Sequence, residues 1–403
     1  MPYRPSFHSF PARSIIWPTM SQAGVYIHIP FCRSRCSYCD FATGMYESEL
    51  AERYVRAVTS EIQTWKEIAN PEPADTIYFG GGTPSLLPVD QLEQILKTIH
   101  GRFIVANHAE ITLEINPGDG GENAVHRCET MRAWHRLGIN RASFGAQTFD
   151  DHALKLLGRT HGSRDIYSTF ARLREAGFQN VSFDLIAGLP GQTLDVWQRN
   201  LTRALELRPE HLSLYLLEVH EGTPLADQIH RGARPVPDED VAAEMYLLMV
   251  EEVCAAGYEH YEISNFCLPG FESRHNTKYW AGAPYYGFGC SAHSFDGDRQ
   301  RWANERDVNR YIDLIKNRGS AIVERTELDA QAARSESIFL GLRLMQGVEL
   351  GAHRLRFGTD LQTEYRDALA QLSAAGLIEL DKELLRLTTR GALLSNEVFA
   401  ALA

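Results

Sequence analysis

Between residues 24 and 218 the sequence alternates short apolar runs with longer amphipathic ones, and no other feature constrains the fold as strongly. The runs that are typical of strands cover residues 24–30, 75–79, 108–115, 139–144, 181–187 and 211–219. The runs that are typical of helices cover 48–69, 90–100, 123–137, 150–157, 163–176 and 194–207. Strands that are joined through helices pair in parallel, with right-handed crossovers. Six such units predict an α/β fold, an open, partial barrel rather than a closed eight-fold one.

The chain after residue 234 has a different pattern. A Pro-Val-Pro break at 235–237 precedes a predicted helix over 238–256, a strand over 258–266 and a glycine-rich loop over 280–295. From Ser335 onward, two helices precede two short apolar runs at 376–380 and 385–388, as in a winged-helix module. We therefore predict a disordered extension over 1–22, a core barrel over 23–234, an extension of that core over 235–330, and a smaller α+β winged-helix-like domain over 331–403.

Composition and charge exclude several classes of protein. The net charge of −12 disfavours a surface that binds nucleic acid. No apolar run reaches the length of a transmembrane helix. The cysteine count of seven is odd and no secretory signal is present, which indicates reduced thiols in the cytoplasm. The first 22 residues lack acidic side chains, as transit peptides do, but four prolines among them would break an amphipathic helix.

Three cysteines are grouped directly after the first predicted strand, at the spacing C-x3-C-x2-C: Cys32, Cys36 and Cys39. Thiolates suit iron–sulfur clusters, and three of them can hold three corners of a cubane while the fourth iron stays open. A structural zinc site is the alternative, but it needs a fourth ligand. His28 lies in an alternating strand, and no second C-x2-C pair follows. The spacing therefore predicts a [4Fe–4S] cluster. The other cysteines, which we expect to be buried apolar residues, are Cys128, Cys254, Cys267 and Cys290.

Candidate ligand-binding residues follow the ends of the next predicted strands. Three glycines at 80–82 would let the backbone approach a ligand closely. Glu114 ends the third strand, where a carboxylate can accept both hydroxyls of a ribose. Gln147 and Asp184 end later strands, and Arg159 comes twelve residues after Gln147. Because ligands of open α/β sheets bind at the carboxyl ends of the strands, these residues predict one site.

A second candidate site is the run H-N-T-K-Y-W at 275–280. An imidazole such as that of His275 is a common axial ligand of haem iron, and Tyr279 and Trp280 offer flat faces to a porphyrin. A cluster of structural aromatics in the core is the alternative. His293, in a glycine-rich stretch, is a second candidate for the iron ligand.

Together these motifs resemble the radical S-adenosylmethionine (SAM) superfamily, and within it the HemW-type haem chaperones. The runs that carry the resemblance are Y-I-H-I-P-F-C at 26–32, C-D-F at 39–41, G-G-G-T-P at 80–84 and H-N-T-K-Y-W at 275–280. The resemblance extends from about Gly24 to the C-terminus. It implies a partial (β/α)6 barrel, a [4Fe–4S] cluster, SAM and haem.

The resemblance also assigns residues to these groups. It implies that Cys32, Cys36 and Cys39 bind the cluster. For SAM it implies Tyr26, Tyr38, Gly81, Gly82, Thr83, Glu114, Gln147, Arg159 and Asp184. For haem it implies His275, Asn276, Tyr279 and Trp280. In the related oxygen-independent coproporphyrinogen III oxidases, the equivalents of Gln147, Arg159 and Asp184 serve a second SAM, and whether this chain binds one stays open.

The function that the resemblance implies is delivery of haem to respiratory proteins at the membrane surface, by a cytoplasmic protein that visits the membrane without spanning it. The alternatives are oxidative decarboxylation of coproporphyrinogen III in porphyrin biosynthesis and another radical SAM reaction. The oxidases carry a fourth cysteine where this chain has Phe41, which favours the chaperone. Phe31 and Phe41 are expected to shield the cluster. Whether SAM is cleaved, so that the chain is an enzyme, and whether it forms a homodimer stay open.

Overall fold

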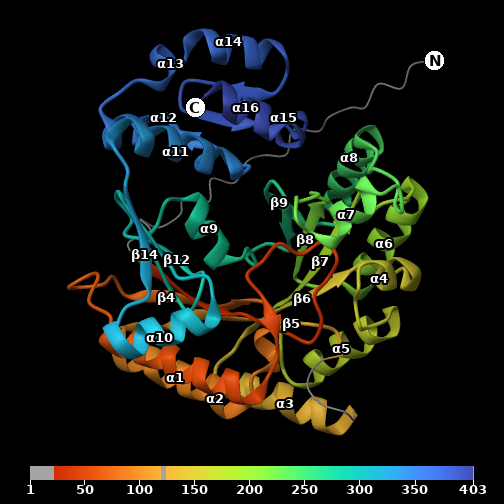
Figure 1. The fold of residues 1–403 in the computed structure, drawn as a ribbon. Coiled ribbons are helices and arrows are strands. Elements are labelled where there is room, and N and C mark those ends of the chain that lie inside the picture. Colours follow the sequence, from red (N-terminus) through yellow and green to blue (C-terminus); the bar gives the residue numbers. More distant parts are fainter. Residues whose placement is uncertain (1–21, 119–123, 403) are drawn as a thin grey trace.

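The computed structural model describes residues 22–118 and 124–402, so residues 1–21 of the extension predicted over 1–22 lie outside this range. One twisted sheet of twelve strands dominates the fold (Figure 1). In spatial order it contains β14 (Ile322–Glu327), β13 (Gln300–Asn304), β12 (His293–Phe295), β11 (Tyr285–Phe288), β1 (Ala23–Ile29), β4 (Ala74–Gly81), β5 (Val105–Ile115), β6 (Arg141–Gln147), β7 (Val181–Ala187), β8 (His211–Leu216), β10 (Asn265–Cys267) and β9 (Glu259–Glu262). The strands from β11 to β8 are parallel, and the flanking strands are antiparallel.

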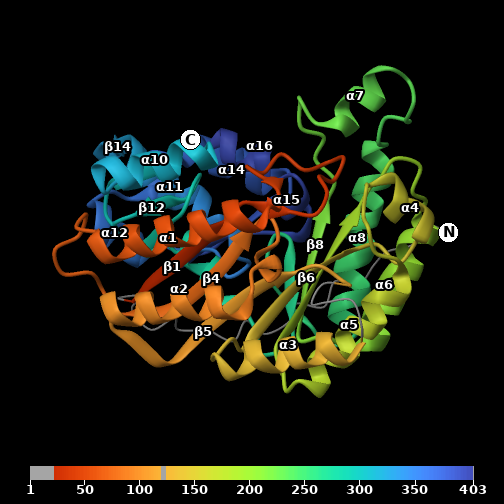
Figure 2. The same ribbon diagram turned by 60° about the horizontal axis from the view of Figure 1, so that its bottom comes forward.

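The central strands are buried on both faces, which explains their near-continuous apolar sequences. Helices cover the outer face of the sheet (Figures 1 and 2): α1 (Ser48–Thr64), α2 (Val89–Arg102), α3 (Ala124–Arg136), α4 (Asp151–Leu156), α5 (Ser163–Glu175), α6 (Leu194–Leu207) and α8 (Glu239–Ala255). The sheet runs from β14 to β9 without closing on itself. The prediction of an open, partial α/β barrel is therefore confirmed.

Two predictions about the later part of the chain were wrong. The stretch 280–295 is not a loop, because β11 pairs in parallel with β1 and β12 turns back along it. Its glycines permit close strand contacts: a Cβ on Gly287 would lie 2.3 Å from the carbonyl oxygen of His293. The stretch 258–266 is not one strand but a hairpin of β9 and β10.

The C-terminal residues form a smaller α+β domain, as predicted, which lies above the sheet in Figure 1. Three short antiparallel strands pair in the order β15 (Val348–Glu349), β17 (Leu384–Leu387) and β16 (Ile378–Leu380). The helices are α11 (Ala330–Arg343), α12 (Leu350–Phe357), α13 (Leu361–Glu364), α14 (Arg366–Ala374), α15 (Thr389–Leu393) and α16 (Ser395–Ala401). Within residues 22–118 and 124–402, no helix combines the length and the apolar composition that crossing a membrane requires.

Candidate functional site

The cysteine-bearing loop begins where β1 ends and is closed by a small parallel strand pair. In this pair β2 (Phe31–Cys32) lies beside β3 (Gly44–Met45). The backbone N–H of Gly44 donates to the Pro30 carbonyl (2.7 Å), and that of Tyr46 donates to the Cys32 carbonyl (2.9 Å). Both ends of the loop are therefore fixed at the carboxyl end of β1.

The middle of the loop is fastened to the far side of the barrel. The backbone N–H of Ser37 donates to the Leu157 carbonyl (2.9 Å), and the Ser37 carbonyl accepts from Leu225 (2.8 Å) at the start of α7 (Pro224–His230). The Arg159 guanidinium donates to the Cys36 sulfur at 3.4 Å. Figure 2 shows the loop, in red, close to α7 and the end of β8. The loop thus spans the opening between the first and last parallel strands.

The three thiols suit a cluster of several metal atoms. Cys32, Cys36 and Cys39 are unpaired and half-buried. Burial raises the pKa of Cys32, and the neighbouring thiols of Cys39 and Cys36 raise it further. Within residues 22–118 and 124–402, no three His, Cys, Asp or Glu side chains are arranged to hold a single metal ion. A cubane has a different requirement, because its cysteines bind separate iron atoms.

The backbone beside these thiols leaves little room for side chains. A Cβ on Gly82 would lie 2.7 Å from the Phe31 carbonyl oxygen and 3.0 Å from the Cys32 sulfur. The Thr83 hydroxyl lies 3.7 Å from the same sulfur and accepts a hydrogen bond from the Asn116 amide (2.8 Å). The glycine run after β4 therefore packs directly against the cysteine loop, and the donor set fits a [4Fe–4S] cluster.

The two phenylalanines of this loop have different surroundings. Phe31 is 1% exposed and packs edge-on against Tyr54. Phe41 is 62% exposed. The expectation that both residues shield the cluster therefore fails for Phe41, because the chain between Cys39 and β3 runs along the surface of the protein.

Glu114, at the end of β5, is half-buried and already accepts two hydrogen bonds. The Tyr78 hydroxyl donates to Oε1 (2.7 Å), and the Gly81 backbone N–H donates to Oε2 (3.0 Å). Burial raises the pKa of Glu114 to about 7. Each carboxylate oxygen has a second lone pair, so the side chain can still accept hydrogen bonds from a ligand.

The ends of β6 and β7 bring further polar groups to the same end of the barrel. Gln147 adopts a left-handed backbone (φ 61°), which is unusual for a residue other than glycine. Arg159 donates to the carbonyl of Gly145 (2.8 Å) and to Asn116 (2.6 Å). Burial raises the pKa of Asp184, which accepts a hydrogen bond from Ser143 at 3.4 Å.

Two tyrosines complete this set. The Tyr26 ring stacks on Tyr78 (centroids 6.1 Å apart), and its hydroxyl contacts Nδ1 of His28 at 3.2 Å. Tyr38 is half-buried, and burial raises its pKa while the charge of Arg159 opposes this rise. The structure therefore assembles the residues that the family resemblance assigns to SAM around the carboxyl ends of the parallel strands. Their role in binding SAM stays a prediction.

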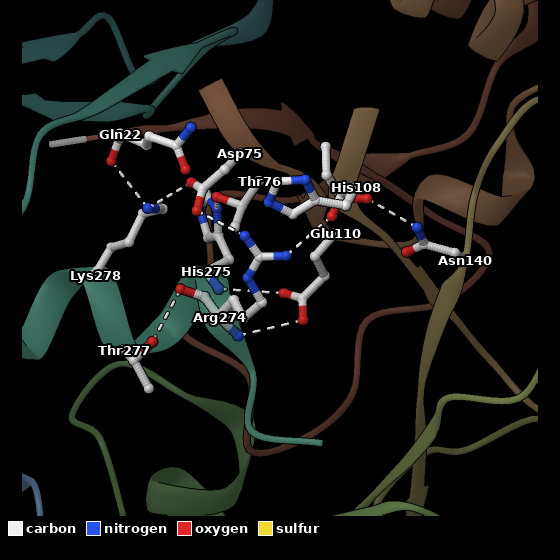
Figure 3. A network of polar contacts seen from close by, with 11 residues as sticks. Gln22, Asp75, Thr76, His108, Glu110, Asn140, Arg274, His275, Thr277 and Lys278 are labelled. Atoms are coloured by element: carbon white, nitrogen blue, oxygen red, sulfur yellow. Dashed lines mark hydrogen bonds and ion pairs between the residues drawn. The ribbon is translucent and has the colours of Figure 1, made fainter. Parts of the chain in front are cut away.

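The H-N-T-K-Y-W motif lies elsewhere, on α9 (Arg274–Trp280), at the inner side of the sheet beneath α11 (Figure 1). Figure 3 shows how its first turn is held. The backbone N–H groups of Arg274 and His275 donate to the Glu110 carboxylate (3.2 and 3.1 Å). The Arg274 side chain pairs with Asp75 (2.7 Å), and buried Lys278 pairs with the same carboxylate (2.6 Å). Because Asp75 lies at the start of β4, the first turn of α9 meets the barrel at the end opposite to the cysteine loop. The His275 ring nevertheless reaches Tyr78, the partner of Glu114, and Tyr26, with centroids 5.1 and 6.2 Å away.

His275 is enclosed by these contacts. Its side chain is 1% exposed, Nδ1 lies 2.8 Å from the Thr76 hydroxyl, and Nε2 lies 2.9 Å from the Tyr279 hydroxyl. Burial lowers the pKa of His275 to about 3, so the ring is neutral at physiological pH. Binding to haem iron would require Nδ1 or Nε2 to give up a hydrogen bond. By contrast, Asn276, Tyr279 and Trp280 are half-buried, and His293 is exposed.

The comparisons with known proteins agree with this geometry. The Radical SAM superfamily matches residues 26–202, and the HemN C-terminal domain matches residues 328–394. A Bacillus subtilis protein named heme chaperone HemW is 37% identical over 378 residues, which are 93% of this chain and 98% of that protein. The chain belongs to the HemW family. The HemW of Synechocystis is 39% identical, over 87% of this chain and 84% of its own length.

A solved structure agrees on the fold. The coproporphyrinogen III oxidase HemN of Escherichia coli, described as a radical SAM enzyme, superposes with a TM-score of 0.82 over 95% of this chain and 90% of its own. Its sequence identity of 23% supports the fold alone. HemN and this HemW-family chain thus share the open barrel and the C-terminal domain.

Sequence reasoning missed the residues that hold α9 in place. Asp75 stands at the start of the strand predicted over 75–79, and Lys278 lies inside the H-N-T-K-Y-W run without a predicted role. The two residues are far apart in the sequence, but they form an ion pair. The side chain of Lys278 is 2% exposed in it and that of Asp75 is 12% exposed. The sequence signal for this ion pair was a carboxylate at the start of an apolar strand, because a buried charge needs a partner of opposite charge.

This ion pair gives a prediction about stability. Replacing Asp75 with Ala should lower the free energy of unfolding by about 3–5 kcal/mol, because it leaves a buried ammonium without its counter-charge. Chemical denaturation with a fixed m-value would measure the change. The exposed pair Arg56–Glu52 on α1 is the matched control, and Glu52→Ala should cost less than about 1 kcal/mol. Equal effects of the two substitutions would contradict the assignment.

Proposed function

We propose that this chain is a haem chaperone that carries a [4Fe–4S] cluster and SAM and passes haem to haem-requiring proteins. The observation that carries the proposal is the similarity to proteins named HemW over nearly the full length of both chains. The site supports it: three unpaired thiols share one loop, and the glycine run and Glu114 adjoin that loop. When bound, the cluster would supply an open iron that SAM can chelate.

Each residue has a proposed role that its position supports. Cys32, Cys36 and Cys39 would hold the cluster. The SAM-binding set would be Tyr26, Tyr38, Gly81, Gly82, Thr83, Glu114, Gln147, Arg159 and Asp184. Haem would lie against α9, where Asn276, Tyr279 and Trp280 are within reach of a ligand. Because both ring nitrogens of His275 are hydrogen-bonded, exposed His293 at the start of β12 stays the alternative candidate for the iron ligand.

The wider setting is also proposed. The acceptors would be respiratory haem proteins at the membrane surface, approached from the cytoplasm, and a homodimer is compatible with this role. Nucleic acid is not expected as a partner because the net charge is −12.

The experiment that tests the proposal compares haem binding with oxidase activity. Anaerobically reconstituted protein should retain about one haem per chain, the stoichiometry expected of a single axial-ligand site. With SAM and a reductant it should release no carbon dioxide from coproporphyrinogen III, while the E. coli oxidase serves as the positive control. Release of carbon dioxide by this chain would favour the oxidase, and the absence of haem binding would remove the chaperone function.

A further inference from the structure

His275 contacts two hydroxyl groups that belong to different parts of the molecule. Thr76 belongs to β4, and Tyr279 lies one helical turn further along α9. The two distances, 2.8 Å to Thr76 and 2.9 Å to Tyr279, are those of good hydrogen bonds. A neutral imidazole has one N–H and one lone pair, so this pair of contacts uses its full capacity. His275 therefore connects the sheet to Tyr279.

The backbone around His275 is shaped to accept the ring. A Cβ on Gly24 would lie 3.0 Å from Cε1 of His275 and 3.1 Å from the Thr76 hydroxyl. The ring also stacks on Tyr78, with centroids 5.1 Å apart and planes at 29°. Together with the two bonds from the helix N-terminus to Glu110, these contacts fix His275 in one orientation.

Tyr279 has a different environment. It is half-buried, and its ring meets Tyr285 edge-on at 4.6 Å. Burial raises the pKa of Tyr279, and Tyr285 and Glu114 raise it further. Trp280 is tied to the C-terminal domain, because the Arg343 guanidinium lies 4.2 Å from its ring centroid. Tyr279 is thus the aromatic of α9 that packs toward the sheet, through Tyr285 on β11 and the ring of His275.

We propose that His275 is a positioning residue and that Tyr279 contacts the bound haem. His275 is held by the Thr76 hydroxyl and in turn holds the Tyr279 hydroxyl in place. This inference rests on the proposed function, and it gives the histidine of the motif a role other than iron ligation. The three side chains act as one unit: the Thr76 hydroxyl orients the imidazole, and the imidazole orients the phenol.

The test measures haem affinity and the absorption spectrum for His275→Gln, Tyr279→Phe and the double variant. Each single substitution should weaken binding about 5- to 10-fold, the effect of one lost hydrogen bond. The double variant should bind haem no more weakly than the single variant that has the lower haem affinity, because both changes break the same connection. The haem that remains bound should have the wild-type Soret band in all three. Tyr167→Phe on α5, 39% exposed, is the control and should change nothing.

A second pair of variants distinguishes the loss of this connection from misfolding. Thr76→Val removes the hydroxyl and should weaken haem binding as His275→Gln does, while Thr76→Ser keeps the hydroxyl and should restore it. A Soret shift in His275→Gln that is absent from Tyr279→Phe would show direct iron ligation and overturn the proposal. Losses that add in the double variant would overturn it as well.

Failure of the proposed function would be recognised separately. If the wild type binds no haem, the chaperone role is wrong, and the connection is then judged from thermal unfolding of the same variants. Non-additive changes in melting temperature for His275→Gln and Tyr279→Phe would support the connection, and additive changes would contradict it.

Discussion

Replacing Cys32, Cys36 or Cys39 with Ala is expected to abolish the iron–sulfur cluster. Reconstituted wild type should contain about four iron and four sulfide per chain, and each variant close to none. The reason is geometric: the three thiols lie on one loop whose two ends are fixed by β2 and β3, so each of them would hold one corner of the cluster. Iron and sulfide analysis after anaerobic reconstitution measures the effect.

The matched controls are cysteines that lie away from the loop. Cys128 on α3 is buried and Cys254 on α8 is half-buried, and changing either to Ala should leave the iron content at the wild-type value. Wild-type protein that retains one zinc per chain after anaerobic purification, instead of iron, would contradict the cluster assignment.

Glu114→Ala is expected to weaken SAM binding by about 30- to 150-fold while the cluster stays intact. Two ribose hydroxyls would lose a charged acceptor, which costs about 2–3 kcal/mol. The partners that hold the side chain, Tyr78 and the Gly81 backbone, stay in place to report on folding. Anaerobic calorimetry measures the affinity, with the exposed Glu52→Ala as the control. An unchanged affinity would remove Glu114 from the site.

The pH dependence of SAM binding provides a second measurement on Glu114. Since burial raises its pKa to about 7, the carboxylate form prevails above that pH and the neutral form below it. Only the carboxylate accepts with both oxygens, so SAM affinity should fall as the pH decreases from 8 to 6. Comparison with Glu114→Gln isolates this contribution, because the amide does not titrate. A pH dependence that is the same in both proteins would contradict the role of the carboxylate.

Local patterns predicted the barrel well, and its ligand-binding end can be read from the sequence. The parallel strands from β1 to β8 each have an apolar run in the sequence, and their carboxyl ends lie at the same edge of the sheet. That rule alone placed Glu114, the glycines at 80–82 and the cysteine loop together.

The sequence could not place α9, because its partners are distant along the chain. His275 meets Thr76 across 199 residues, and no local period indicates which strand a later helix will cover. The sequence therefore allowed the His275 imidazole to be an iron ligand, whereas in the structure both of its nitrogens hydrogen-bond to hydroxyl groups. The same difficulty hid β11, whose glycines suggested a loop although they permit a close strand contact. Phe41 was misplaced because hydrophobicity alone does not distinguish a buried ring from an exposed one.

Transfer of haem from this chain to another protein is the central part of the proposed function, and a transfer assay tests it most directly. Haem-loaded, cluster-containing protein would be mixed anaerobically with a haem-free apoprotein that has a distinct holo spectrum, and the two would then be separated. The proposed function predicts that the haem leaves this chain and that the acceptor gains it in near-equal amount. Haem that stays with this chain, or a chain that binds none, would contradict it.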